Sequence, residues 1–185
     1  MRRIAVGLMV STLMLALRAA PAAAQRATSH HHAYIGVGGG LSIPTGDFAN
    51  GFKTGWDVDV LAGFTTRGGI WGGRADLMWA QNNLKGGLNG HERLLGLNGD
   101  VVITPGHRPA NWHPYLLAGI GLYNGKESGT TGSDTKFAIN GGAGVQIHTG
   151  HRTDVFVEGR FITVRSSGGG TNFIPINFGF RWGGI

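Results

Sequence analysis

The chain has 185 residues, of which 35 are glycine and none is cysteine, and its formal net charge is +6. Hydrophobic residues make up 41% and charged residues 14%, which excludes a disordered or collagen-like chain and suits one domain. Without cysteine, disulfides and cysteine-ligated zinc are excluded. Arg2, Arg3 and Arg18 fall in a predicted leader, so the rest of the chain carries about +3. No basic patch is interleaved with aromatic residues, and nucleic acid is therefore not an expected partner.

The N-terminal stretch has the three parts of a secretory signal peptide. A basic start is followed by an apolar run over Ile4–Leu17 and by the small residues Ala22–Ala24. The alternative, a membrane-spanning helix or anchor, is less favoured because the run is short for a span. We predict a signal peptide over residues 1–24, removed on export, then a polar N-terminal segment over 25–33 and a single barrel domain over 34–185.

The most informative strand pattern lies at the C-terminal end, in Phe173–Trp182. Alternate residues there are Ile174, Ile176, Phe178, Phe180 and Trp182, and those between them are mostly polar or small. Because a strand directs alternate side chains to opposite faces, one face of this strand is wholly apolar.

Seven further segments alternate in the same way between glycine-rich or polar loops. They lie at about residues 33–43, 54–66, 70–81, 91–104, 113–124, 136–148 and 153–165. Each is about as long as a tilted strand must be to cross a bilayer. No helical period of 3.6 residues is found after the leader. The pattern predicts an all-β fold of eight antiparallel strands.

Two barrels fit eight alternating strands: a soluble one with the apolar face inside, and an outer-membrane one with the apolar face towards lipid. The tryptophans favour the second, since they fall on the apolar face near two levels, as in the aromatic girdles of membrane barrels. Trp56 and Trp79 mark one level, and Trp71, Trp182 and Trp112, the last in a turn, mark the other. The scarcity of lysine on the polar face and the leader agree. We therefore predict an up-and-down transmembrane β-barrel with a polar lumen and an apolar outer face.

The polar face then encloses many charged side chains. They are Asp57, Asp59, Arg74, Asp76, Glu92, Asp100, Lys136, Asp154, Glu158, Arg160 and Arg181. Eight strands leave an interior just wide enough for side chains to fill, and a buried charge needs a partner. Inward-facing glycines would leave room for arginines to cross the lumen. We predict an ion-pair network that plugs the barrel; the alternative is a wet lumen with hydrated, unpaired charges.

In these features the chain resembles the small outer-membrane β-barrel domain family of the OmpA/OmpX-like kind. The leader, the eight segments, the loop Ile43–Ala49 and the closing strand carry the resemblance, which covers about residues 25–185. It implies insertion by the outer-membrane assembly machinery, contact with outer-membrane lipid and lipopolysaccharide, and both termini on the periplasmic side. Loops 44–53, 82–90, 125–135 and 166–172 would face outside.

Few residues suggest chemistry. The glycine run Gly36–Gly40 lacks the spacing and the following helix of a nucleotide fingerprint. No nucleophile, base and orienting group share a strand face, so an enzyme is not expected, and neither is a cofactor. His107, His113, His148 and His151 fall near the predicted periplasmic rim and are weak candidates for a metal site, but ordinary turn residues are the favoured interpretation. Phe48, Phe52 and Leu84 could form small contact patches on external loops, but simple strand connectors are the favoured interpretation of these loops.

We therefore expect a monomeric, non-enzymatic outer-membrane protein with a role in envelope integrity or surface contact. A narrow porin-like conduit for ions or small solutes is the alternative. A soluble carrier of an apolar ligand is the third possibility. Conductance across a planar bilayer separates the first two.

Overall fold

The computed structural model describes residues 32–66, 69–85, 90–105, 111–127, 134–150, 152–165 and 171–183. The predicted signal peptide, and nearly all of the predicted polar segment 25–33, lie outside the described residues.

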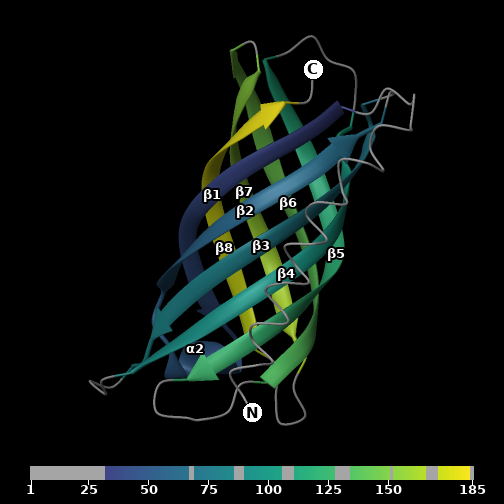
Figure 1. The fold of residues 1–185 in the computed structure, drawn as a ribbon. Helices are drawn as coiled ribbons and strands as arrows, with labels where there is room; N and C mark the ends of the chain where they lie inside the picture. The colour runs from purple at the N-terminus through teal and green to yellow at the C-terminus, as the bar shows by residue number, and fades with distance from the viewer. Residues whose placement is uncertain are drawn as a thin grey trace, which may run out of the picture. The chain divides into compact units, whose positions relative to one another are not determined.

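Eight antiparallel strands form a closed barrel in which each strand pairs with the next in the chain and the last pairs with the first (Figure 1). They are β1 (His32–Thr45), β2 (Gly55–Thr65), β3 (Trp71–Asn83), β4 (His91–Ile103), β5 (Trp112–Glu127), β6 (Asp134–Gly150), β7 (Thr153–Val164) and β8 (Thr171–Gly183). The predicted up-and-down barrel is confirmed.

The strand ends differ from the prediction most clearly at β5 and β6. The loop expected over 125–135 is shorter, because the hydrogen-bonded ladder continues to the pair Gly125 and Asp134. Glycine and polar residues at a hairpin end interrupt the hydrophobic alternation without interrupting the backbone pairing, so the sequence pattern ends too early.

The loop predicted after β1 contains a short helix, α2 (Asp47–Gly51). Phe48 on this helix is buried, and its ring lies 4.6 Å from that of the half-buried Phe52. Phe48 is therefore not available for an external contact patch, because it packs into the interior of the barrel, with Phe52 partly buried against the same cluster. Within the described residues, no helix is long and apolar enough to span a bilayer.

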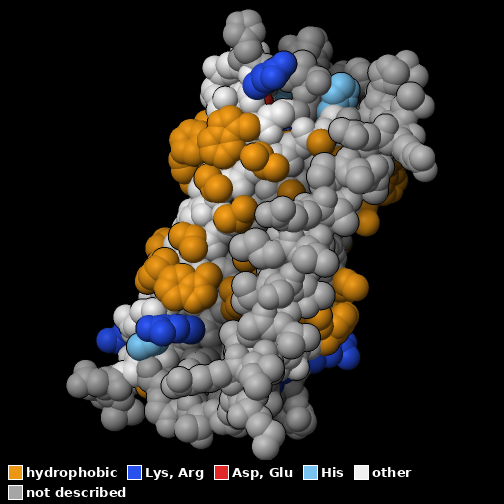
Figure 2. Space-filling model, viewed as in Figure 1, with side chains coloured by type: hydrophobic (Ala, Val, Ile, Leu, Met, Phe, Trp, Pro, Cys, Tyr) orange, Lys and Arg blue, Asp and Glu red, His pale blue; other side chains and the backbone are white. Residues whose placement is uncertain are grey.

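The outer wall is apolar, as predicted. Figure 2 shows hydrophobic side chains along the visible wall, with lysine and arginine near its two ends. Exposed hydrophobic side chains come from every strand and include Ile35, Val37, Val60, Leu77, Leu97, Val101, Leu116, Ile120, Phe137, Val157, Phe161, Ile176 and Phe178. A water-soluble protein would bury such residues, so this surface suits hydrocarbon.

The tryptophans lie near the two ends of the wall. We call the end that carries α2 the helix end, and the end where β1 begins and β8 finishes the terminal end. Trp56 and Trp79 lie towards the helix end with ring centroids 4.7 Å apart. Trp71, Trp112 and Trp182 lie towards the terminal end, and all three are exposed. Trp112 is the first residue of β5 rather than part of a turn, which corrects the prediction.

Inside the barrel, large aromatic side chains lie opposite glycines. The directly paired residues are Tyr34 and Gly63, Tyr123 and Gly96, Tyr115 and Gly144, and Phe156 and Gly179. In each pair the ring occupies the space that a side chain on the glycine would need. The interior glycines thus make room for neighbouring side chains to cross a narrow lumen.

This arrangement predicts that Gly144→Ala destabilises the barrel. A Cβ atom there would lie 2.5 Å from the Tyr115 ring and hydroxyl and 2.8 Å from the Val157 carbonyl oxygen. We expect a loss of about 1–3 kcal/mol in the free energy of unfolding, typical of overpacking. Urea titration of the detergent-folded barrel measures it. Gly99→Ala is the control, because a Cβ there meets nothing within 4 Å. Equal stability of the two variants would contradict the packing argument.

Candidate functional site

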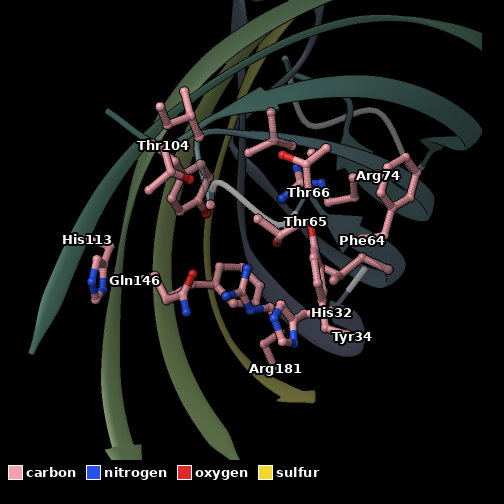
Figure 3. A pocket seen from close by; sticks show the side chains of 17 residues that line it. His32, Tyr34, Phe64, Thr65, Thr66, Arg74, Thr104, His113, Gln146 and Arg181 are labelled. Carbon is pink, nitrogen blue, oxygen red and sulfur yellow. The ribbon is translucent and has the colours of Figure 1, made fainter. Parts of the chain in front are cut away.

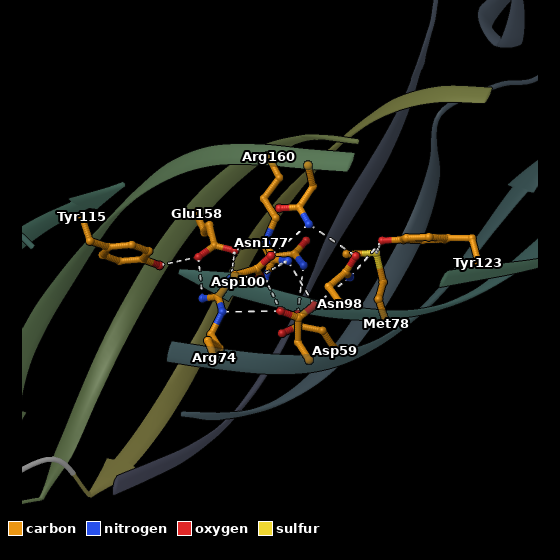
Figure 4. Close-up of polar contacts among 12 residues, drawn as sticks. Asp59, Arg74, Met78, Asn98, Asp100, Tyr115, Tyr123, Glu158, Arg160 and Asn177 are labelled. Carbon is orange, nitrogen blue, oxygen red and sulfur yellow. Dashed lines mark hydrogen bonds and ion pairs between the residues drawn. The ribbon is translucent and has the colours of Figure 1, made fainter. Parts of the chain in front are cut away.

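The candidate site is a group of charged side chains in the middle of the lumen. Strand alternation places Arg74 and Asp76 of β3, Asp100 of β4, and Glu158 and Arg160 of β7 on the inner face, and all are buried. We call these five residues the ionic core. Because β7 lies across the lumen from β3 and β4, their pairing joins opposite walls (Figure 4).

Arg74 forms a two-pronged contact with Glu158. Its Nη1 lies 2.7 Å from Oε2 and its Nη2 lies 2.8 Å from Oε1 of the carboxylate. Tyr115 donates a further hydrogen bond of 2.7 Å to Oε2. Parallel N–H···O bonds of this kind are among the strongest polar contacts in proteins and fix the orientation of both partners.

Arg160 contacts three carboxylates. Its Nη1 and Nη2 each lie 3.0 Å from an oxygen of Asp76, and Nη1 lies 3.3 Å from Asp100 Oδ2. Its Nε donates to Glu158. One guanidinium group therefore links acids from β3, β4 and β7, which makes Arg160 the central residue of the ionic core.

Neutral amides complete the hydrogen bonding of the acids. Asn98 Nδ2 donates to Asp76 at 2.9 Å, and Asn140 Nδ2 donates to Asp100 at 2.9 Å. The sequence analysis did not select these asparagines or Tyr115, although they lie on the same face as the charges. Their position on the inner face was the one feature of the sequence that could have indicated a contact with the charges. Buried charges require such partners, since desolvation otherwise outweighs the ionic attraction.

The other predicted lumen charges divide into three groups. Asp154 is buried near the terminal end, where Arg181 Nη2 lies 3.2 Å and His148 Nδ1 lies 2.7 Å from its carboxylate oxygens. Gln146 also donates to it. Asp57 and Asp59 are buried on β2, but within the described residues neither forms an ion pair.

Glu92 and Lys136 do not join the ionic core. Both are only half-buried and lie near the helix end of β4 and β6. Lys136 makes no ion pair with another described residue. The strand pattern places both side chains on the inner face, but it does not show whether a residue lies in the middle of the barrel or at its opening.

At the helix end, an apolar cluster closes the lumen. It consists of Phe48, Met78, Ala80, Leu94, Tyr123, Ala138, Ile162, Val164 and Phe173, with Phe52 packed against it. The predicted polar lumen did not include this layer. Apart from Phe48 on α2, its members lie on the inner face of their strands, and the layer forms only where these strands come together.

At the terminal end, the lumen opens into a cavity of 340 Å³ (Figure 3). Its lining includes Tyr34, Arg74, Tyr115, Gln146 and Arg181. The Arg181 guanidinium lies 4.2 Å from the centre of the Tyr34 ring. The cavity thus extends from the mouth of the barrel to Arg74, where the ionic core begins.

Of the four candidate histidines, the structure describes His113 and His148. His113 lines the terminal cavity and His148 binds Asp154, whereas His107 and His151 lie outside the described residues. Across the described ranges, no group of three histidine, aspartate or glutamate side chains is arranged to hold a metal. Gly36–Gly40 lies within β1, between β2 and β8, so it forms part of the barrel wall.

A closed antiparallel barrel with an apolar outer wall and a core of ion pairs defines an outer-membrane β-barrel protein. The model of the outer membrane protein beta-barrel domain matches residues 11–182, and the chain belongs to that family. No curated protein matches the chain.

Solved structures agree on the fold. Neisserial surface protein A (NspA) is 13% identical with a TM-score of 0.66, over 81% of this chain and 96% of that one. Ail, the attachment invasion locus protein of Yersinia pestis, is 16% identical with a TM-score of 0.54, over 82% and 98%. A major outer membrane protein from Thermus thermophilus is 11% identical with a TM-score of 0.53, over 83% and 99%. At these identities, the likeness concerns the fold.

Proposed function

We propose that the protein is a non-enzymatic, monomeric barrel that resides in the outer membrane after export and removal of the signal peptide, and that supports the envelope or mediates surface contact. In this proposal the lumen is closed and does not transport solutes. The observation that carries it is the sequence of layers across the lumen: the ionic core in the middle and the apolar cluster at the helix end.

The apolar cluster is the stronger barrier. Ions crossing the lumen would have to shed water against buried side chains of β3, β4, β5, β6, β7 and β8, which is unfavourable in a low-dielectric setting. Arg74 and Arg160 are in turn held by carboxylates on opposite walls. A conduit would need both layers to move.

Basic residues at the helix end support contact with the lipopolysaccharide of the outer leaflet. Lys53, Arg93 and Arg165 are all exposed there, beyond Trp56 and Trp79. Cationic side chains next to an aromatic belt match anionic groups above a hydrocarbon layer. The helix end would then face outside, with the assembly machinery inserting the chain from the periplasm. Attachment is part of the name of Ail, and surface contact at this end is the corresponding role proposed here.

Planar-bilayer recording tests the closed lumen. We expect the mature barrel to insert without steady single-channel steps, whereas a general porin in the same bilayer conducts. Reproducible steps would favour the narrow conduit instead. In that case Arg74→Ala should change the step size, because Arg74 borders the terminal cavity, while the exposed Arg93→Ala should not.

A further inference from the structure

The middle of the lumen holds more acids than bases. The buried carboxyl groups there are those of Asp57, Asp59, Asp76, Asp100 and Glu158, and the buried guanidinium groups are those of Arg74 and Arg160. The two arginines contact Asp76, Asp100 and Glu158, and no ion pair among the described residues includes Asp57 or Asp59. With an apolar wall around it, this excess of negative charge requires a counter-charge.

Asp57 is the most deeply buried of the acids that have no ion-pair partner among the described residues. Its relative exposure is 1%, and no donor meets full hydrogen-bond geometry at either carboxyl oxygen, although the Asn177 amide lies close enough to interact with this carboxylate. The side-chain oxygen of the buried Asn177 also has no hydrogen-bond partner. Buried acceptors without donors are rare in folded proteins and strongly unfavourable when charged. Asp57 and Asn177 lie on the inner face on either side of β1, and two such acceptors indicate that a positively charged group belongs between them.

The strand register brings these oxygens together. Gly40 of β1 pairs with Asp57 on one side and with Asn177 on the other. A Cβ atom on Gly40 would lie 2.7 Å from Asn177 Oδ1, so the Asn177 side chain leans over the glycine into the gap. Asn177 Nδ2 donates to Asp59 Oδ1 at 2.9 Å, which leaves its oxygen free to face a cation.

Asp59 approaches the same gap from the next inner position of β2. Its Oδ1 lies 2.5 Å from where a Cβ atom on Gly38 would stand, so this carboxylate also extends over the glycines of β1. Asp57 and Asp59 interact electrostatically with each other. The glycines of β1 therefore create the space, and β2 and β8 supply oxygen atoms around it.

We propose that Asp57, Asp59 and Asn177 form a binding site for Ca²⁺. Asn177 donates through Nδ2 to Asp59 and keeps its side-chain oxygen as an acceptor, and two carboxylates with an amide oxygen are the ligands that hard divalent cations prefer. Within the described residues no third carboxylate or imidazole shares the site, so water completes the coordination. With two charged ligands, the expected dissociation constant is about 10⁻⁴–10⁻³ M, as in weak extracellular calcium sites.

Calcium titration of the mature barrel in nonionic detergent, freed of metal with EDTA, tests the site. Calorimetry should show one Ca²⁺ per barrel. The melting temperature should rise on the order of 3–10 °C at about 10 mM Ca²⁺, since ligand binding stabilises only the folded state. Asp57→Asn keeps the shape and removes a charged ligand, and we expect it to abolish both effects. Asp47→Asn, at an exposed position of α2, should retain both the binding and the rise in melting temperature.

Loss of the calcium effects in Asp57→Asn but not in Asp47→Asn supports the site. The proposal is overturned if Ca²⁺ neither binds nor raises the melting temperature of the parent. It is also overturned if both variants lose the effect equally, which indicates diffuse surface binding. If Asp57→Asn does not refold, Asp59→Asn removes the second carboxylate and must abolish binding in its place. If the parent barrel does not bind Ca²⁺ and has the same melting temperature as Asp57→Asn, Asp57 carries a proton and needs no cation.

Discussion

Arg160→Ala is expected to lower the free energy of unfolding of the barrel by about 3–5 kcal/mol, the usual consequence of removing one partner from a buried ionic group. The guanidinium of Arg160 contacts Asp76, Asp100 and Glu158 at once. Without it, these buried carboxylates keep Arg74, the Tyr115 hydroxyl and neutral amides as partners. Urea unfolding of the detergent-folded barrel, followed by tryptophan fluorescence and gel mobility, measures the loss.

The exposed Arg165→Ala, just beyond β7, is the control and should change stability by less than about 0.5 kcal/mol, as surface substitutions usually do. A second variant separates charge from volume. Replacing Arg160 by methionine together with Asp76→Asn and Glu158→Gln removes three of the five charges, keeps the side-chain sizes similar, and leaves Arg74 3.8 Å from Asp100 as an ion pair. This triple variant should recover most of the free energy of unfolding that Arg160→Ala loses. Uncharged side chains of similar size in place of buried ionic groups often leave a protein no less stable than before. If Arg160→Ala unfolds like the parent, the ionic core does not hold the walls together.

Phe173→Ala is expected to destabilise the barrel by a similar amount, about 3–5 kcal/mol, as for other fully buried phenylalanines. Phe173 has no exposed surface, and its ring centroid lies 5.9 Å from that of Tyr123 within the apolar cluster. Its removal leaves a cavity in the interior of the barrel that lipid does not reach. The same urea titration reports the effect.

Phe178→Ala provides the matched control on the same strand, because Phe178 is exposed on the outer wall. Detergent or lipid can occupy the space that the ring leaves, so a clearly smaller loss is expected there. The reverse ranking, with Phe178→Ala the more damaging change, would contradict the division between a packed interior and a lipid-facing wall.

Strand alternation was sufficient to predict which residues of a strand share a face, because the period of two residues is a property of the backbone itself. The two levels of tryptophan, the scarcity of lysine and the leader then indicated that the face of Arg74 and Glu158 lies inside and that Phe178 faces lipid. The partners could not be predicted in this way. Whether Arg160 meets Asp76 or Asp57 depends on strand register and on side-chain reach, which alternation does not specify.

Two other features escaped prediction for different reasons. Helix α2 has five residues, too few for a helical period to be recognised, and Phe48 therefore looked like a loop residue. The apolar cluster was missed because each strand contributes only one or two residues to it, for example Leu94 or Ile162. Its hydrophobic character becomes visible only when the strand ends are brought together.

The order of the contacts along the chain has a consequence for assembly. Arg74 and Glu158 are 84 positions apart, as are Asp76 and Arg160. The charges of β3 are thus neutralised only when β7 is in place, and the edge of β1 is covered only when β8 pairs with it. Contacts this distant in sequence slow folding. A barrel with only its first strands in place would have both an open edge and unmatched charge, which disfavours stable partial structures.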